Sequence, residues 1–505
     1  MTVIKQDDLI QSIADALQFI SYYHPKDYIQ ALAEAYEHEQ SAAAKDAIAQ
    51  ILYNSRLCAE GHRPICQDTG IVVAFLEIGM NVQWDSQLSV DEMINEGVRQ
   101  AYTNPDNVLR ASVLADPAGK RQNTKDNTPA VIHTRMVSGD TVHIKLAAKG
   151  GGSENKAKFA ALTPSADLVG WIVKSVAEMG AGWCPPGIMG VGIGGTPEKA
   201  MLMAKESLLE PVNFHELEQK AAQGLELSRA EQLRLELYEK INALGVGAQG
   251  LGGLTTVVDV KVLDYPTHAA SLPVAIIPNC AATRHTHFTL DGSGPAVLTP
   301  PSLEDWPDIT WSASPRARRV NLDNTTHDDI QSWKPGEQLL LSGKLLTGRD
   351  AAHKKITETL ARGEALPEGV DFNNRFIYYV GPVDAVKGES VGPAGPTTST
   401  RMDKYTETML AETGLIGMIG KAERGPIALE AIRKHKAVYL IAVGGAAYLL
   451  SKAIEKSTVI AYEELGMEAI YEFEIKDMPV TVGVDVNGES VHLSGPKKWA
   501  RMTQF

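Results

Sequence analysis

The amino-acid sequence predicts a mixed α/β protein built from two domains. A chain of 505 residues exceeds the usual size of one domain. Apolar patterns typical of helices and of strands are interspersed along most of the chain. A proline-rich segment with little periodicity, 289–325, interrupts these patterns. We therefore expect a large N-terminal α/β domain over 1–298, a linker over 299–314 and a smaller C-terminal α/β domain over 315–505.

Individual elements follow from the spacing of apolar residues. The first 50 residues are expected to be helical, since Leu9, Ile13, Ala16 and Ile20 recur at helical spacing. In the rest of the first half we expect strands at 70–78, 130–137, 141–148, 254–263 and 272–278, with 130–137 and 141–148 paired as a hairpin, and helices at 164–179 and 213–243. In the second half we expect strands near 338–342, 376–380, 437–442, 467–474 and 479–485, and helices near 403–413 and 445–454.

Net charge excludes some classes of function. The formal charge is −14, whereas nucleic-acid and membrane-surface binders present a basic face. An anionic small-molecule substrate stays possible if arginines and lysines gather locally. No apolar run approaches the roughly 18 residues of a membrane span. Asp7 and Asp8 do not suit a signal or transit peptide, so we expect a cytoplasmic protein.

Three glycine-rich segments could bind phosphates or other anions. The segments GVGIGG (190–195) and GVGAQG (245–250) both satisfy G-x-G-x-x-G. A dinucleotide fold needs this motif between a strand and a helix. The first follows Cys-Pro-Pro-Gly and the second a helix, so dinucleotide binding is disfavoured. The triplet 150–152 is either a flexible turn or a loop whose backbone N–H groups meet an anion.

Four cysteines are too few for a disulfide scaffold. Cys66, Cys184 and Cys280 stand in turns rich in Gly or Pro, or at a strand end, whereas Cys58 stands in a helical pattern and is interpreted as packing. Each cysteine alone is more often a small buried apolar residue. If the three converge, their thiolates suit an iron–sulfur cluster with one open iron.

A zinc site is the alternative metal hypothesis. Its ligands would be Cys280, His285 and His287. The spacing is loose for a zinc motif, and the sequence disfavours it.

Longer motifs connect the chain to a known family. They are PICQDTG, AAKGGGSENK, GWCPPGIMGVGIGGTPEKA, IPNCAATRH, LLTGRDAAHKK and GPTTSTRMDKYTETMLAETGLIGMIGKAERG. Over nearly its whole length the chain resembles the class I fumarases, single-chain iron–sulfur fumarate hydratases. It is also similar to the two-subunit L-tartrate dehydratases and to the mesaconate hydratases.

The resemblance implies a cofactor, an architecture and a set of site residues. It implies a [4Fe–4S] cluster bound by Cys66, Cys184 and Cys280, with substrate on the fourth iron. It further implies a cluster-binding N-terminal domain, a swivelling C-terminal domain that closes over it, and a homodimer. By position in the motifs, the substrate-binding residues are Gln67, Arg110, Gly151, Arg349, Arg401 and Lys421, and the catalytic residues are Asp68, Thr397 and His268.

The chemistry of these residue types agrees with the implied reaction. Fumarate carries a carboxylate at each end, and arginine offers a carboxylate a bidentate fork. Asp68 stands two residues from Cys66 and could handle the oxygen-side proton, unless it merely caps a turn. Thr397 is the first candidate for the carbon-side proton and His268 the second.

We therefore predict an oxygen-sensitive hydro-lyase that interconverts fumarate and L-malate. Mesaconate or L-tartrate is the alternative substrate, because these molecules share both carboxylates. A nucleic-acid-binding iron sensor is the alternative from another class, and the acidic charge disfavours it.

Overall fold

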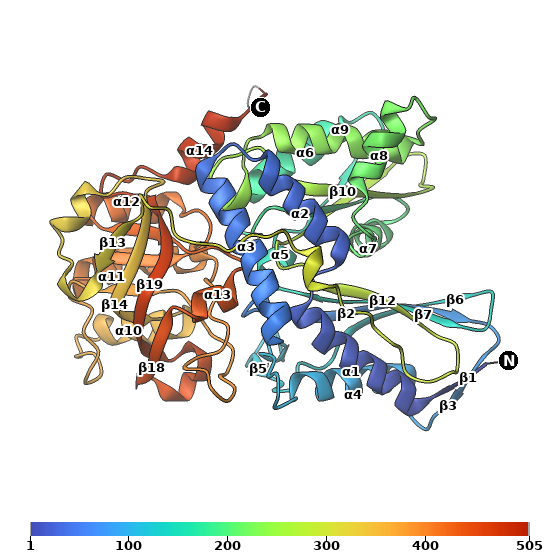
Figure 1. Cartoon of the computed structure of the whole chain (residues 1–505), viewed down its shortest axis with the longest axis horizontal. Helices are drawn as coiled ribbons and strands as arrows, with labels where there is room; N and C mark the ends of the chain where they lie inside the picture. Colours follow the sequence, from blue (N-terminus) through green and yellow to red (C-terminus); the bar gives the residue numbers. More distant parts are fainter. Residues whose placement is uncertain (1, 503–505) are drawn as a thin grey trace.

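The computed structural model describes residues 2–502 and confirms a mixed α/β protein with two domains (Figure 1). One domain contains two separate four-stranded sheets, and the other contains one seven-stranded sheet. The boundaries at 299 and 314 and the swivelling of the second domain stay predictions. Within the described residues no helix has the length and apolarity to cross a bilayer.

The first four-stranded sheet corrects the predicted hairpin. In spatial order its strands are β12 (His285–Leu290), β7 (Val142–Lys149), β2 (Ile71–Gly79) and β6 (Val131–Val137). β6 and β7 are not paired, because β2 lies between them and pairs with both. The 138–141 connection arches over the end of β2, where Met80 N donates to Val137 O at 2.9 Å. A strand as apolar as β2 is buried on both sides.

The second sheet explains the first glycine motif. Its order is β10 (Val257–Tyr265), β9 (Gly187–Gly194), β11 (Leu272–Asn279) and β8 (Lys158–Leu162). The GVGIGG segment itself forms most of β9, a strand that was not expected, whereas residues 184–186 before it are not in a strand, as expected. A Cβ at Gly190 or Gly192 would collide with the backbone of α7 (Pro197–Ser207). These two glycines therefore permit a close helix–sheet approach and need not serve a phosphate.

Helices cover both sheets. They are α1 (Gln6–Tyr22), α2 (Lys26–His38), α3 (Ala42–Gly61), α4 (Val90–Tyr102), α5 (Gly151–Glu154), α6 (Leu168–Met179), α8 (Phe214–Ala222) and α9 (Arg229–Ala243). α8 and α9 replace the single helix expected at 213–243. Gly224 leaves α8 with φ +69°, and Ser228 begins α9 with a capping box. The short pairs β1 (Thr2–Lys5) with β3 (Val82–Asp85) and β4 (Leu114–Ala115) with β5 (Gln122–Asn123) were not expected.

The C-terminal sheet closes on itself. Its strands are β13 (Arg318–Asn321), β14 (Gln338–Thr347), β15 (Phe376–Tyr378), β16 (Gly417–Gly420), β17 (Val438–Ile441), β19 (Ile470–Val484) and β18 (Ile454–Ala461), with helices α10 (Asp350–Ala361), α11 (Asp403–Thr413), α12 (Pro426–His435), α13 (Ala447–Ser451) and α14 (Val491–Trp499). β14 to β17 are parallel, and β19 pairs antiparallel with both β14 and β17. β19 is one strand where two were expected, and β18 was missed. The resulting ring encloses an apolar core.

Helix α3 occupies the seam between the domains, as Figure 1 shows. One apolar cluster runs without interruption from α2 and α3 into the C-terminal domain. The proline-rich segment crosses α3 and is fixed to it by two tryptophans: Trp306 Nε1 donates to Ser55 Oγ at 2.9 Å, and Trp311 Nε1 to Asp46 Oδ1 at 3.0 Å. The linker is therefore attached to the seam along its length.

We expect Arg63→Leu to lower the free energy of unfolding by about 3–5 kcal/mol, because it leaves a buried carboxylate unpaired across the seam. Arg63 Nε and Nη2 each donate to the Glu389 carboxylate at 2.9 Å. Both side chains are largely buried, at 3% and 11% exposed. Denaturant unfolding measures the loss. Arg362→Leu removes an exposed pair with Glu364 and should change stability by less than about 1 kcal/mol; equal effects would contradict this role of Arg63.

Candidate active site

A cavity of about 140 Å³ lies where the two domains meet. Both domains line it. From the N-terminal domain come Gln67, Asp68, Arg110, Gly151, Gly152, Asn155 and Lys156, and from the C-terminal domain Arg349, Thr397, Thr398, Thr400, Arg401 and Lys421. The structure thus brings together eight of the nine substrate-binding and catalytic residues predicted from the sequence.

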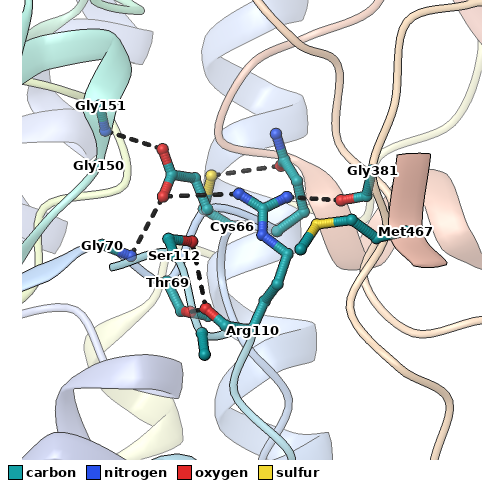
Figure 2. Close-up of polar contacts among 12 residues, drawn as sticks. Cys66, Thr69, Gly70, Arg110, Ser112, Gly150, Gly151, Gly381 and Met467 are labelled. Carbon is teal, nitrogen blue, oxygen red and sulfur yellow. Dashed lines mark hydrogen bonds and ion pairs between the residues drawn. The ribbon is translucent and has the colours of Figure 1, made fainter. Parts of the chain in front are cut away.

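Loops at element ends deliver the N-terminal side of the cavity. The Cys66–Asp68 segment connects α3 to β2, and Gly151 begins α5 directly after β7. Arg110 follows α4, and its Nη1 donates to the carbonyl of Gly381 in the C-terminal domain at 2.6 Å. The Arg110 side chain therefore reaches across the seam (Figure 2).

The carboxyl ends of parallel strands deliver the C-terminal side. Arg349 stands two residues beyond β14, and Lys421 one residue beyond β16. Thr397 N donates to Tyr379 O at 2.7 Å, and Lys421 N donates to Thr397 O at 3.2 Å. Because the ends of parallel strands share one edge, their side chains converge there.

Positive charge dominates the cavity. Its charged lining consists of five cations, Arg110, Lys156, Arg349, Arg401 and Lys421, and one carboxylate, Asp68. Burial, and then the nearby Arg110, lowers the pKa of Arg349 to about 10. Arg349 Nε is buried without a hydrogen-bond partner among the residues described, and Glu468 approaches its Nη2 only to 3.5 Å. Such an excess of incompletely paired cations suits a ligand with more than one negative charge.

Asp68 is held as a carboxylate by several donors. Gly151 N donates to Oδ2 at 2.8 Å and Gly70 N to Oδ1 at 3.2 Å. Figure 2 shows Gly70 and Gly151 with the Arg110 guanidinium, whose Nη2 lies 3.6 Å from Oδ1. Burial by itself would raise the pKa of Asp68, but Arg110 and Arg284 lower it below its ordinary value. The Gly151 N–H is therefore bonded to a carboxylate of the protein itself, and binding of a ligand anion by the glycine triplet stays a prediction.

The three predicted cluster ligands do not line the cavity but lie near Lys421, which does. Cys66 and Cys184 are buried, at 7% and 4% exposed, and Cys280 is partly buried. Burial raises the pKa of the Cys66 thiol, and raises that of Cys184 to about 11. Burial alone would lower the pKa of Lys421, but Cys184 and Cys66 beside it raise it well above its usual value. A buried cation therefore faces these sulfurs.

Three thiolates are the donor chemistry that an iron–sulfur cluster takes. No three Cys, His, Asp or Glu side chains within 2–502 gather closely enough to hold one metal ion. A cubane takes each thiolate on a different iron, so its ligands need not converge on one point. Cys280, His285 and His287, the ligands of the alternative zinc site, do not form such a group within the described residues. A ring nitrogen of His287 is hydrogen-bonded to Leu209 O at 2.6 Å.

Of the nine substrate-binding and catalytic residues predicted from the sequence, only His268 does not line the cavity. It lies in an exposed loop after β10, where its Nδ1 accepts from Ala270 N at 3.2 Å. Its catalytic role stays a prediction. Cys58 is fully buried within α3, in agreement with packing.

Several cavity residues were missed individually although the motifs contain them. Asn155 and Lys156 end the AAKGGGSENK motif, and Thr398 and Thr400 belong to GPTTST. Arg284, from IPNCAATRH, lies behind the cavity and donates from Nη1 to Asp68 O at 2.6 Å. The contiguity of these residues with Gly151, Thr397 and Cys280 was the signal available.

Two family models together match nearly the whole chain. The family model described as fumarate hydratase matches residues 10–289, and the model described as the fumarase C-terminus matches 292–495.

Individual relatives support the same family. The anaerobic class I fumarate hydratase of Escherichia coli K12 is 32% identical, over 95% of this chain and 87% of its own. Fumarate hydratase 2 of Leishmania major is 29% identical, over 94% and 85%. A putative L(+)-tartrate dehydratase subunit alpha of Methanocaldococcus jannaschii is 34% identical, over 54% of this chain and 94% of its own. With family models over both domains and relatives of nearly full length, the chain belongs to the class I fumarate hydratase family.

Proposed function

We propose that this protein is a fumarate hydratase that interconverts fumarate and L-malate at the cavity between its domains. The observation that carries the proposal is the lining of five cations and one carboxylate around about 140 Å³. A four-carbon dianion matches both the charge and the small size. Mesaconate adds one methyl group, which a pocket discriminates by only about 1–3 kcal/mol.

Arg349 and Arg401 are proposed to bind one carboxylate and Lys421 to contribute a further positive charge. A guanidinium fork fits a carboxylate in plane, whereas an ammonium acts as a point charge. Arg401 is ion-paired with Asp350 and 42% exposed, so it can reorient toward a ligand. Gln67 and Gly151 are proposed to contact the substrate from the opposite side of the cavity.

Cys66, Cys184 and Cys280 are proposed to hold a [4Fe–4S] cluster. Bound there, such a cluster would supply Lewis-acid chemistry toward the oxygen added to or removed from the substrate. Asp68, which accepts hydrogen bonds from Gly70 N and Gly151 N, is proposed to accept or return the oxygen-side proton. Closure of the seam around the cavity excludes bulk water from these charges. Oxygen sensitivity, a homodimer and a cytoplasmic location remain predictions.

An anaerobic assay tests the proposed substrate. Protein reconstituted with iron and sulfide is supplied separately with fumarate, mesaconate and L-tartrate, and kcat/KM is measured for each. We expect fumarate to be preferred. A higher kcat/KM for mesaconate or L-tartrate would reassign the substrate, and inactivity of iron-loaded protein toward all three would overturn the hydratase proposal.

We expect Thr397→Ala to slow the exchange of the carbon-bound proton of L-malate by about 10²–10⁴-fold, the usual contribution of a positioned acid or base. The Thr397 side chain is buried at the cavity wall, at 7% exposed. NMR of L-malate deuterated at the methylene carbon follows the exchange separately from dehydration. Asp68→Asn should instead slow dehydration more than exchange. Normal exchange in Thr397→Ala would move the base elsewhere, with His268 the next candidate.

A further inference from the structure

Two buried amides connect the cysteine-bearing loops to one turn of the C-terminal domain. Asn54, on α3, is fully buried, and Gln249, after α9, is 2% exposed. Neither lines the cavity. Both contact the turn between β17 and α13, which contains Gly444 and Gly445 and which we name the diglycine turn.

Asn54 joins the Cys66 loop to this turn. Its Nδ2 donates to Ile65 O, directly before Cys66, at 3.2 Å and to Gly445 O at 3.0 Å. Its Oδ1 accepts from Tyr448 N and Leu449 N, both at 2.9 Å, at the start of α13. Both polar atoms of the amide are thus satisfied, and three of the four bonds cross the domain boundary.

Gln249 makes the equivalent connection for the Cys184 loop. Its Nε2 donates to Pro185 O at 2.9 Å and to Gly444 O at 3.1 Å. Its Oε1 accepts from Gly444 N at 2.8 Å. The residue adopts φ +55°, a left-handed conformation that is uncommon for a non-glycine residue.

The diglycine turn touches the cysteine site itself. A Cβ on Gly444 would lie 2.5 Å from Cys184 Sγ, and one on Gly445 would lie 3.4 Å from Ala281 Cβ, next to Cys280. Gly445 also has φ +89°. The turn therefore approaches the sulfurs as only glycine permits.

We propose that Asn54 and Gln249 are positioning residues that dock the diglycine turn as a wall of the three-cysteine site, so that the C-terminal domain controls access to sulfurs it does not contain. The proposal rests on the function proposed above only in taking this site to be the cofactor site. Breaking either amide bridge opens the wall and exposes Cys66 and Cys184.

Isosteric substitutions test the proposal in the metal-free full chain. Asn54→Asp and Gln249→Glu keep the side-chain oxygen that accepts hydrogen bonds. They replace the NH2 group, which donates to two backbone carbonyls, with a second carboxylate oxygen that cannot donate. Asn242→Asp is the matched control: its Nδ2 donates to Val257 O, and its Oδ1 accepts from Thr256 N and Val257 N, all within one domain. The rate at which iodoacetamide alkylates Cys66 and Cys184 is measured by mass spectrometry.

We expect both bridge variants to raise alkylation of these two cysteines at least tenfold and to speed iron release to a chelator in loaded protein, whereas Asn242→Asp only lowers Tm. Wild-type alkylation rates in both folded bridge variants, or an equal rise in the control, would overturn the proposal. If a variant does not fold, hydrogen exchange in wild-type protein decides: cluster loading should slow exchange of the Gly444, Tyr448 and Leu449 amides, and unchanged exchange there would refute the wall. Failure of wild-type protein to bind iron would refute the cofactor assignment. The alkylation rates, measured without metal, would still test whether the diglycine turn covers the cysteines.

Discussion

Replacing Arg349 with methionine is expected to lower kcat/KM for fumarate roughly 30- to several-thousand-fold. This corresponds to a loss of about 2–5 kcal/mol in transition-state stabilisation. The side chain is 12% exposed, and Glu468 pairs with it only loosely. The Nε group has no partner within the described chain. A bound substrate carboxylate would supply the hydrogen-bond acceptor that this guanidinium lacks. Removing the guanidinium leaves the desolvated carboxylate without enough donors. Steady-state kinetics at several fumarate concentrations separate kcat from KM.

Arg375→Met is the control for that experiment. Arg375 also lies in the C-terminal domain and pairs with Glu472 at 2.9 Å, with both side chains 23% exposed, but it does not line the cavity. Its kcat/KM should stay within about threefold of the wild-type value. Arg349→Lys should recover only part of the loss, because lysine lacks the planar fork. Wild-type kinetics in Arg349→Met would remove this residue from the site.

The second large effect is expected from the cysteines. Serine at Cys66, Cys184 or Cys280 should abolish hydratase activity, because a hydroxyl is a poor replacement for a thiolate on iron. Iron content per chain and visible absorbance after anaerobic reconstitution report the cofactor independently of activity. Each variant should retain markedly less iron than the wild type.

Cys58→Ala provides the comparison within the same chain. Cys58 is fully buried beside Cys66 in one apolar cluster, so alanine should reduce stability modestly and leave iron content unchanged. Loss of iron in this variant would show that Cys58 takes part in binding. Full iron content in all three serine variants would rule out the proposed ligand set.

Local signals in the sequence were sufficient for much of the fold. The helical spacing of Leu9 to Ile20 gave α1, and the apolar 70–78 run gave β2. Pairing between distant strands was not readable in the same way. The Ser-Gly-Asp connection suggests a hairpin, yet β2, far earlier in the chain, lies between β6 and β7. A periodic pattern shows which face is buried but not which strand is adjacent.

β19 was divided in two for a local reason. Asp477 and Pro479 are typical turn residues, and Asp477 does adopt φ +51°. In the structure they form an irregularity within a continuous strand, at the register shift opposite Leu341 and Gly343. Strand β14 pairs with β19 before and after this point and maintains the strand through it.

The candidate site was largely predictable because its residues lie within long contiguous motifs. Asn54 and Gln249 were not predictable, since a buried amide looks like any other helix or loop residue until its partners in the other domain, 195 or more positions away, are known. His268 illustrates the opposite failure. A residue can match a family position and still lie on an exposed loop of the single chain.

The attachment of the proline-rich segment to α3 through Trp306 and Trp311 has a consequence for how the active site assembles. Because one chain supplies both sides of the cavity, the halves are always present in equal number, and their association does not weaken on dilution. Fixing the connection at Trp306 and Trp311 shortens the free path between the halves and raises their effective concentration. The site is therefore expected to form with first-order kinetics as each chain folds, whatever the protein concentration.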